Sequence, residues 1–398
     1  MIIPRTERQR RFVAMAQELA PRFAERAPEH DRLGTFPHEN FAEIREAGLP
    51  KLVIPQEFGG WGANLLETVL TMEALAVGDG STALSLTMHM QVMGSAAETR
   101  SWPRELFAHI CQEVVQRGAL VNSIATEPEL GSPSRGGLPK TTAKPVYANR
   151  GVEPVAWIID GYKTYASMSP ALDYFIIPAA LQDGSGHVAR FVVPKGPHIQ
   201  IIENWDAMGM RATGSHDIRI VEARVPHRFM LHRGHPQADD PTKSTINAWF
   251  ALTVSAVYLG VAQAALETAI RYAQERVPTA LGKPIAQLES VQRRLGQADL
   301  LLTQAQALLT QVADDWDRFP DRRRDLSPDI VAAKVTVTNH ALEAVDHCMR
   351  VAGGASMSKR LPLERYYRDV RAGLYHPVVD DQAFPMLGRA AMKRFQEK

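Results

Sequence analysis

Cysteine is scarce in this chain of 398 residues, which contains only Cys111 and Cys348. Two cysteines are too few for the disulfide framework of a small secreted domain or for a zinc site with four cysteine ligands. A surplus of charge is also missing, because 45 Lys and Arg balance 44 Asp and Glu and leave a formal net charge of +1. This balance argues against a protein that mainly binds nucleic acid and against an acidic disordered chain.

Long hydrophobic runs are missing as well. The N-terminus leads directly into the charged stretch 5–11, and no apolar segment of signal-peptide length follows it. The most apolar stretch, 248–264, contains polar side chains and is shorter than the about 20 apolar residues of a membrane-spanning helix. We therefore expect a buried core helix at 248–264, no membrane association and a cytoplasmic location.

Several common catalytic and binding motifs are absent. No G-x-G-x-x-G follows an expected strand, and the chain has no G-x-x-x-x-G-K-S/T, G-x-S-x-G or H-E-x-x-H. His340 and His347 lie two helical turns apart next to Cys348, but further ligands have no obvious source. The sequence therefore predicts no metal site, no P-loop and no Rossmann-type dinucleotide site.

What the chain does contain is three blocks of different periodicity. Residues 1–116 repeat apolar side chains at helical spacing, residues 117–232 contain short apolar runs between Gly, Pro and Asp, and residues 233–398 return to the helical period. We predict a helical domain, an antiparallel β domain and a second helical domain with these boundaries.

Four segments, in order along almost the whole chain, resemble the acyl-CoA dehydrogenase superfamily. They are GLPKLVIPQEFGG at 48–60, ATEPELGS at 125–132, MGMRATGS at 208–215 with Val225-Pro226, and GKPI at 282–285 paired with Gly353-Gly354 and RYYRD at 365–369. The resemblance implies an α+β fold with an N-terminal helical domain, a central antiparallel β domain and a C-terminal four-helix bundle. It also implies a flavin between the β domain and the bundle, and a homotetramer or homodimer.

The resemblance also assigns residues to the flavin and the substrate. A flavin edge presents alternating carbonyl and N–H groups, which short hydroxyl side chains on turns can match. The cofactor residues are then Thr126, Ser132, Tyr165, Ser167, Arg276, Gly353 and Gly354, and the substrate residues are Ser132, Arg211 and Phe250. FAD is the expected cofactor. FMN is the alternative, because Leu281 and Arg350 replace a Phe and a Gln that usually help to hold the adenine half.

One departure from the family pattern bears on the reaction. Dehydrogenases of this family use a Glu, a few residues after the Arg-Asp of the last motif, to take the α-proton of an acyl thioester. In this chain that position is Pro377, and the alternative position on the helix before it is Phe250. Neither side chain can accept a proton.

The missing carboxylate leaves three interpretations. The favoured one is a monooxygenase that uses reduced flavin and O2, similar to dibenzothiophene monooxygenase, with His376, Ser167 and His89 as catalytic residues and a flavin reductase as partner. The second is an acyl-CoA dehydrogenase that uses His376, Asp380 or Asp381 as the base and an electron-transfer flavoprotein as partner. The third is a non-catalytic flavin-binding or regulatory protein. All three interpretations predict that the protein binds a small molecule, for which an acyl-CoA is one candidate, and that it does not bind nucleic acid.

Overall fold

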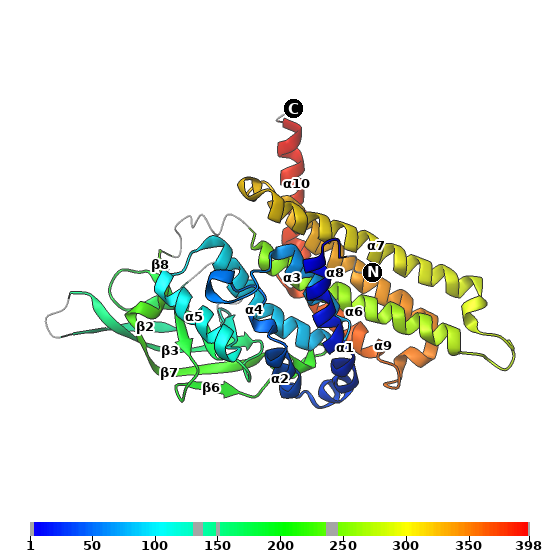
Figure 1. Ribbon diagram of the computed structural model, residues 1–398, viewed down its shortest axis with the longest axis horizontal. Helices are drawn as coiled ribbons and strands as arrows, with labels where there is room; N and C mark the ends of the chain where they lie inside the picture. Colours follow the sequence, from blue (N-terminus) through cyan, green and yellow to red (C-terminus); the bar gives the residue numbers. More distant parts are fainter. Residues whose placement is uncertain (1–3, 130–137, 149–151, 236–245, 397–398) are drawn as a thin grey trace.

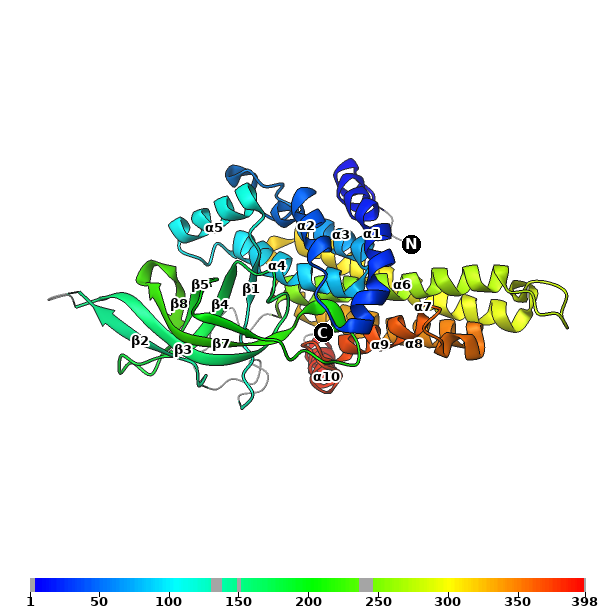
Figure 2. The ribbon, with the colours of Figure 1, turned by 90° about the horizontal axis from the view of Figure 1, so that it is seen from below.

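The computed structural model describes residues 4–129, 138–148, 152–235 and 246–396. Figure 1 shows a sheet at one end of the molecule and long helices that extend away from it at the other end, with the N-terminal helices between and above them. Figure 2, turned by 90°, shows the same separation of sheet and long helices. The α, β, α order predicted from periodicity and the fold predicted from the resemblance are confirmed.

The N-terminal part consists of five helices joined by short turns. They are α1 (Glu7–Leu33), α2 (His38–Glu46), α3 (Leu65–Ala76), α4 (Gly80–Thr99) and α5 (Arg104–Arg117), with 3-10 turns η1 (Leu49–Lys51) and η2 (Gln56–Phe58). The start of α1 is fixed by a capping box, in which the Thr6 hydroxyl accepts from the Gln9 backbone and the Gln9 side chain accepts from the Thr6 backbone. Gly34, in the left-handed conformation, ends the helix.

The central part is one sheet of eight strands. These are β1 (Val121–Ser123), β2 (Thr142–Tyr147), β3 (Pro154–Ala166), β4 (Tyr174–Leu181), β5 (Val188–Pro194), β6 (Ile199–Ile202), β7 (His216–Pro226) and β8 (Met230–Gly234). The strand order is β6-β7-β3-β2-β4-β5-β8, and β1 pairs with β4. Two short turns, η4 (Arg211–Thr213) and η5 (His227–Phe229), flank β7.

The sheet is mixed, so the prediction of a purely antiparallel β domain is wrong in this detail. β4 pairs in parallel with both β1 and β2, whereas the other pairings are antiparallel. Parallel neighbours need a crossover connection, and β3 provides it between β2 and β4. The alternation of apolar side chains identifies strands, but it carries no information about their direction.

The C-terminal part contains three long helices, α6 (Ala248–Glu275), α7 (Glu289–Arg318) and α8 (Ser327–Ala352), followed by α9 (Leu363–Asp369) and α10 (Asp380–Gln396). The 3-10 turns η6 (Ile285–Gln287), η7 (Pro320–Arg322), η8 (Gly353–Met357) and η9 (Val370–Tyr375) lie between them. Helix α10 projects from the body (Figure 1) and leaves the large side chains of Phe384, Met392 and Phe395 exposed. The predicted boundary at 116/117 falls one residue before the end of α5, and the one at 232/233 falls inside β8.

Helix α6 accounts for the most apolar stretch of the sequence. Within the described residues it is the one helix long and apolar enough to cross a membrane, with a mean hydropathy of 1.6 in its most apolar window. Of that window, 89% is buried inside the protein, against α3, α4 and α8. Packing in the core therefore explains its composition.

A close contact between α4 and α6 joins the N-terminal helices to the bundle. The Trp249 ring lies against Gly94, where an added Cβ would come within 2.2 Å of a ring carbon. Trp249 is buried, with 4% of its surface exposed. The absence of a side chain at position 94 is therefore what allows the two helices to approach.

We predict that Gly94→Ala destabilises the protein by about 1–3 kcal/mol, because the extra methyl group must displace a buried ring. The matched control is Gly296→Ala on the exposed face of α7, where an added Cβ meets no atom within 4 Å. This control should be neutral or stabilising, since Ala is the better helix former. Urea unfolding of both variants measures the difference, and an equally stable Gly94→Ala variant would contradict the described packing.

Candidate functional site

A turn at the end of β3 brings together two of the predicted flavin residues. Tyr165 and Met168 adopt positive φ angles of 56° and 67°, which directs successive side chains of the turn away from the regular strand. The Ser167 hydroxyl lies 2.8 Å from the Ser215 hydroxyl, and Asn122 Nδ2 donates to the Ser167 carbonyl at 2.9 Å. Tyr165 is 64% exposed, so its ring is available to a bound molecule.

Hydroxyl groups continue from Ser167 into the protein. The Ser215 hydroxyl lies 2.7 Å from that of Thr213, which donates to the Met210 carbonyl at 3.0 Å. The Met210 N–H in turn donates to Asp369 Oδ1 of α9 at 2.6 Å. One path of hydrogen bonds therefore connects the Ser167 turn of the β domain with the C-terminal helices.

The loop that contains Thr126 lies beside the same turn. The Thr126 carbonyl accepts from the Thr164 N–H at 2.9 Å, one residue before Tyr165. Thr126, Tyr165 and Ser167 therefore lie close together on one wall, and their predicted contacts with a flavin stay a prediction. Ser132, predicted to contact the pyrophosphate or the substrate, lies outside the described residues.

A buried ion pair anchors this loop, and the sequence analysis did not identify it. Lys163 Nζ of β3 donates to Glu127 Oε1 at 2.5 Å and to the Pro178 carbonyl at 2.9 Å, with both charged side chains at most 2% exposed. Burial alone would raise the pKa of Glu127, but hydrogen bonds from Lys163, Thr141 and Lys140 outweigh it and lower that pKa. Glu127 is therefore a structural carboxylate that fixes its neighbour Thr126.

His376 and Phe250 form a second group of predicted site residues. The two rings lie edge to face with centroids 5.8 Å apart, and Tyr258 of α6 lies at the same distance from His376 on another side. Burial, and to a lesser extent the positive charge of Lys334, lower the pKa of His376 to about 4. His376 is therefore a neutral imidazole at pH 7, with one N–H donor and one acceptor nitrogen.

His89 occupies a different environment from the one predicted for a catalytic residue. It is fully buried in α4, where Nε2 lies 2.9 Å from the Pro50 carbonyl and Nδ1 accepts from the Val121 N–H at 3.1 Å. With Nε2 as the donor, both ring nitrogens are used by the backbone. In this arrangement His89 has no free group for a ligand and joins η1, α4 and β1.

Arg211 lies at a junction between domains and does not face the wall formed by Thr126, Tyr165 and Ser167. Its guanidinium donates to the Asp31 carbonyl at 2.7 Å and to Asp206 and the Ala207 carbonyl at 2.8 Å. These partners use three of its donors. The structure therefore gives Arg211 a structural role in place of the predicted contact with substrate.

Arg276, Gly353 and Gly354 lie at the far end of the bundle. Arg276 directly follows α6 and Gly353 directly follows α8, at the end away from the sheet (Figures 1 and 2). Along α6, Arg276 is 26 positions from Phe250, or about 39 Å at the rise of an α-helix. One flavin dinucleotide cannot span from the Phe250 end of α6 to these three residues within one chain.

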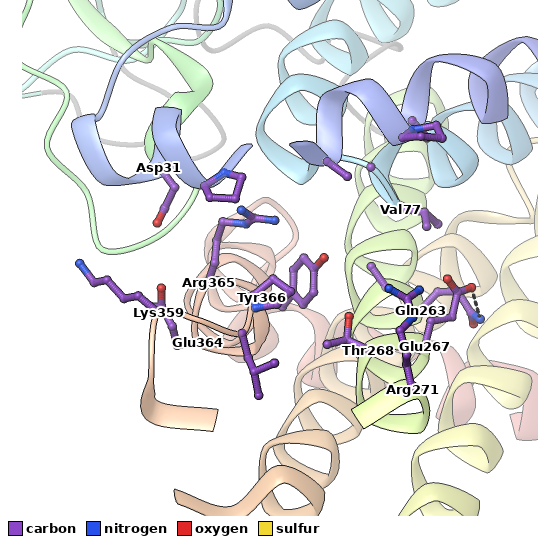
Figure 3. Close-up of a pocket in the computed structure, with 18 of the residues that line it drawn as sticks. Asp31, Val77, Gln263, Glu267, Thr268, Arg271, Lys359, Glu364, Arg365 and Tyr366 are labelled. Atoms are coloured by element: carbon purple, nitrogen blue, oxygen red, sulfur yellow. Dashed lines mark hydrogen bonds between the residues drawn. The ribbon is translucent and has the colours of Figure 1, made fainter. Parts of the chain in front are cut away.

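A cavity of about 1030 Å³ lies between α1, α3, α6 and α9. Figure 3 shows side chains from α6, such as Glu267 and Arg271, and from α9, such as Arg365 and Tyr366, around it. None of the predicted site residues lines this cavity. Within the described ranges, no three His, Cys, Asp or Glu residues are grouped so that they could hold a metal ion.

Comparisons with known proteins identify the relatives of this chain. The profile "Acyl-CoA dehydrogenase, N-terminal domain" matches residues 6–100, and "Acyl-CoA dehydrogenase, C-terminal domain" matches residues 252–381. A putative acyl-CoA dehydrogenase of Bacillus subtilis, YdbM, is 38% identical over 97% of this chain and 98% of its own length. The L-evernosamine nitrososynthase of a Micromonospora strain is 30% identical over 93% of this chain and 87% of its own.

One related protein has been solved with ligands bound. KijD3, in complex with FMN and a dTDP-linked 3-amino-4-keto sugar, superposes with a TM-score of 0.85 at 29% identity, covering 98% of this chain and 95% of that one. The relatives therefore include a protein described as a putative dehydrogenase, a nitrososynthase named for an amino sugar, and a protein solved with an amino sugar nucleotide bound.

We predict that Lys163→Met destabilises the protein by about 3–5 kcal/mol, because it leaves the buried Glu127 carboxylate without its counter-charge. Flavin affinity should fall at least tenfold as the Thr126 loop loses its anchor. Lys144→Met on the exposed part of β2 is the matched control. Urea unfolding and flavin titration measure both effects, and a Lys163→Met variant that equals wild type in both would show that the pair does not anchor the loop.

Proposed function

The chain belongs to the acyl-CoA dehydrogenase family and is a flavin-dependent oxidoreductase, and we propose that it is a monooxygenase that uses reduced flavin and O2. The observation that carries the proposal is the pair His376-Pro377. The resemblance puts Pro377 at the position of the family's catalytic glutamate, and the residue before it is an imidazole whose pKa burial lowers to about 4. A dehydrogenase needs a base here, whereas a monooxygenase needs a hydrogen-bonding group beside the flavin.

The other candidate bases are poorly suited to take an α-proton. Asp380 Oδ2 accepts from Asn339 Nδ2 of α8 at 3.0 Å, which holds this carboxylate against the bundle. Asp381 is exposed to solvent. His376 itself is a weak base, since a general base works best with a pKa close to the working pH and its own pKa is about 4.

The residues of the β-domain wall fit a flavin. The Thr126 side chain, on the loop beside Tyr165, carries a hydroxyl that can meet a carbonyl or N–H on the edge of the ring. The Ser167 hydroxyl is held by Ser215, and the exposed Tyr165 ring offers an apolar face. When bound, reduced flavin supplies the electrons and the reaction with O2.

The chain's own groups then have distinct roles. The neutral His376 can donate its N–H to an oxygen atom of the reacting group and accept a proton at its other nitrogen. The Ser167 hydroxyl offers a second donor, and the Phe250 ring beside His376 excludes water. Such fixed donors in a dry site stabilise developing negative charge on oxygen.

The relatives support this proposal and suggest the substrates to test. The nitrososynthases and KijD3 point to N-oxidation of an amine, with amino sugars as the first class to examine, and to FMN as a cofactor beside FAD. A flavin reductase would supply the reduced flavin. FAD contacts with Arg276, Gly353 and Gly354 require a second copy of the chain, so we propose a homodimer or homotetramer, located in the cytoplasm.

A second candidate function has its own support. The 38% identity to YdbM favours acyl-CoA dehydrogenation, with His376 as a weak base and an electron-transfer flavoprotein as acceptor. The two functions differ in how the flavin is reduced. In a dehydrogenase the thioester substrate reduces it, whereas in a monooxygenase the reductase does.

One experiment separates the two functions. The purified protein is loaded with FMN or FAD and mixed anaerobically with a panel of acyl-CoAs, and absorbance at the flavin band is followed. Separately, pre-reduced protein is mixed with O2 and dTDP-linked amino sugars, and oxidised products are measured by mass spectrometry. We expect no bleaching by thioesters and an oxygenated product; bleaching by an acyl-CoA would overturn the proposal.

We predict that His376→Ala lowers the rate of product formation by about 10²–10⁴-fold, the usual contribution of a positioned acid–base group. Flavin binding should remain unchanged, because the wall of Thr126, Tyr165 and Ser167 is intact. The matched control is His232→Ala on the exposed strand β8. An unaffected rate in the His376 variant would remove this residue from the mechanism.

A further inference from the structure

Buried polar atoms without partners gather next to His376. In the part of the chain that the structure describes, seven buried side-chain nitrogen or oxygen atoms have no hydrogen-bond partner. Three of them belong to this one region: Tyr258 Oη of α6, Lys334 Nζ of α8 and Asp380 Oδ1 at the start of α10. An unpaired buried polar group is costly, so a cluster of three in one place requires an explanation.

Contacts from three elements place this cluster around His376. Tyr258 packs against the His376 ring, with centroids 5.8 Å apart. Lys334 is 1% exposed, and Val331 and Val335, which flank it on α8, pack in one cluster with Val378, two residues after His376. Gly373, three residues before His376, lies so close to Tyr258 and Thr338 that an added Cβ would come within 2.9 and 3.1 Å of them.

Asp380 joins the chain after His376 to helix α8. Its Oδ2 accepts from Asn339 Nδ2 at 3.0 Å, and its Oδ1 has no hydrogen-bond partner among the described residues. The bond between Asn339 and Asp380 thus ties the segment after His376 to α8. Lys334 Nζ, on the same helix, makes no hydrogen bond within the described ranges, so it contributes a charge and not a contact.

We propose that Lys334 acts through His376 by placing a buried positive charge near the imidazole, while the hydrogen bond between Asn339 and Asp380 holds the segment that follows His376 on α8. The functional consequence rests on the proposed role of His376 in oxygen chemistry. The effect of Lys334 on the protonation of His376 does not depend on that role. An experiment can therefore contradict this effect without contradicting the proposed function, and the reverse.

The protonation states of Lys334 and Tyr258 stay the same over the pH range in which His376 titrates. Burial lowers the pKa of Lys334 to about 8, although Asp380 opposes this effect, so Lys334 is mostly protonated at pH 7. Tyr258 remains a neutral phenol because burial raises its pKa. Lys334 is therefore charged over the whole range in which His376 titrates, and its charge disfavours the imidazolium. His376 therefore stays a neutral ring with one donor and one acceptor nitrogen and does not become a second cation beside Lys334.

Deuterium exchange at the imidazole C2 position, followed by mass spectrometry of the purified flavin-loaded protein, tests the proposal without any activity measurement. The exchange rate depends on the protonation of the ring, and His376→Gln identifies the peptide that carries its signal. Between pH 5 and 8 we expect wild-type His376 to stay neutral. In Lys334→Met its exchange profile should shift to higher pH, so that protonation of the ring becomes detectable at the acidic end of this range, since desolvation remains but the repelling charge is gone.

Two variants serve as controls. Lys334→Arg keeps the positive charge and should behave as wild type, and Lys283→Met removes an exposed lysine and should also change nothing. If Lys334→Met does not fold, as judged by circular dichroism, Lys334→Gln replaces it. A His376 exchange profile identical to that of wild type in a folded, uncharged Lys334 variant would overturn the proposal, whatever reaction the enzyme catalyses.

A separate experiment tests whether α8 holds the segment that follows His376. Asn339→Ala removes the hydrogen bond to Asp380, so backbone amides of the peptide that contains residues 376–383 should exchange at least tenfold faster. Peptides of β8 in the same sample serve as the internal reference. Unchanged exchange in the 376–383 peptide would show that α8 does not fix this segment.

Discussion

Arg368 connects the three parts of the molecule. Its Nη2 binds Asp31 Oδ2 of α1 at 2.6 Å, its Nη1 donates to the Met208 carbonyl of the β domain at 2.9 Å, and its Nε binds Glu364 of its own helix α9 at 2.8 Å. A guanidinium suits this task because its donors lie in a rigid plane and point in several directions. This junction therefore helps to hold the wall of Thr126, Tyr165 and Ser167 and the His376 segment in a fixed relation.

The next residue strengthens the same junction. Asp369 accepts the Met210 N–H at 2.6 Å, and Gly209 lies so close to α9 that an added Cβ would come within 2.4 Å of the Arg368 carbonyl. From Met210 the hydroxyls of Thr213 and Ser215 lead to Ser167. The Arg-Asp motif therefore acts as a structural link between the turn with the Ser167 hydroxyl and the helix that precedes His376.

The sequence predicted the order of the domains because apolar periodicity is a local property. It also predicted that Thr126, Tyr165 and Ser167 belong together, through motifs that the chain shares with its relatives. It could not predict the direction of β4 or the position of Arg211, since both depend on contacts between distant segments. The 180 positions between Arg211 and Asp31 contain no pattern that would pair them.

Two further residues show what local patterns can and cannot reveal. His89 sits in a Met-rich helix, and nothing near it in sequence indicates that Pro50 and Val121 provide its partners. Lys334, by contrast, lies four residues after the buried Ile330 and four before the buried Thr338, on the inward face of α8. A lysine at such a position is unusual enough to be noticed from the sequence alone.

The resemblance puts Pro377 where the family's dehydrogenases carry a glutamate, so the residue next to His376 supplies no carboxylate. Burial, and to a lesser extent the charge of Lys334, lower the pKa of His376 to about 4. A ring with so low a pKa is a neutral hydrogen-bonding group at pH 7 and a weak base. The missing carboxylate and the buried surroundings of His376 therefore act in the same direction, because both disfavour proton abstraction at this position.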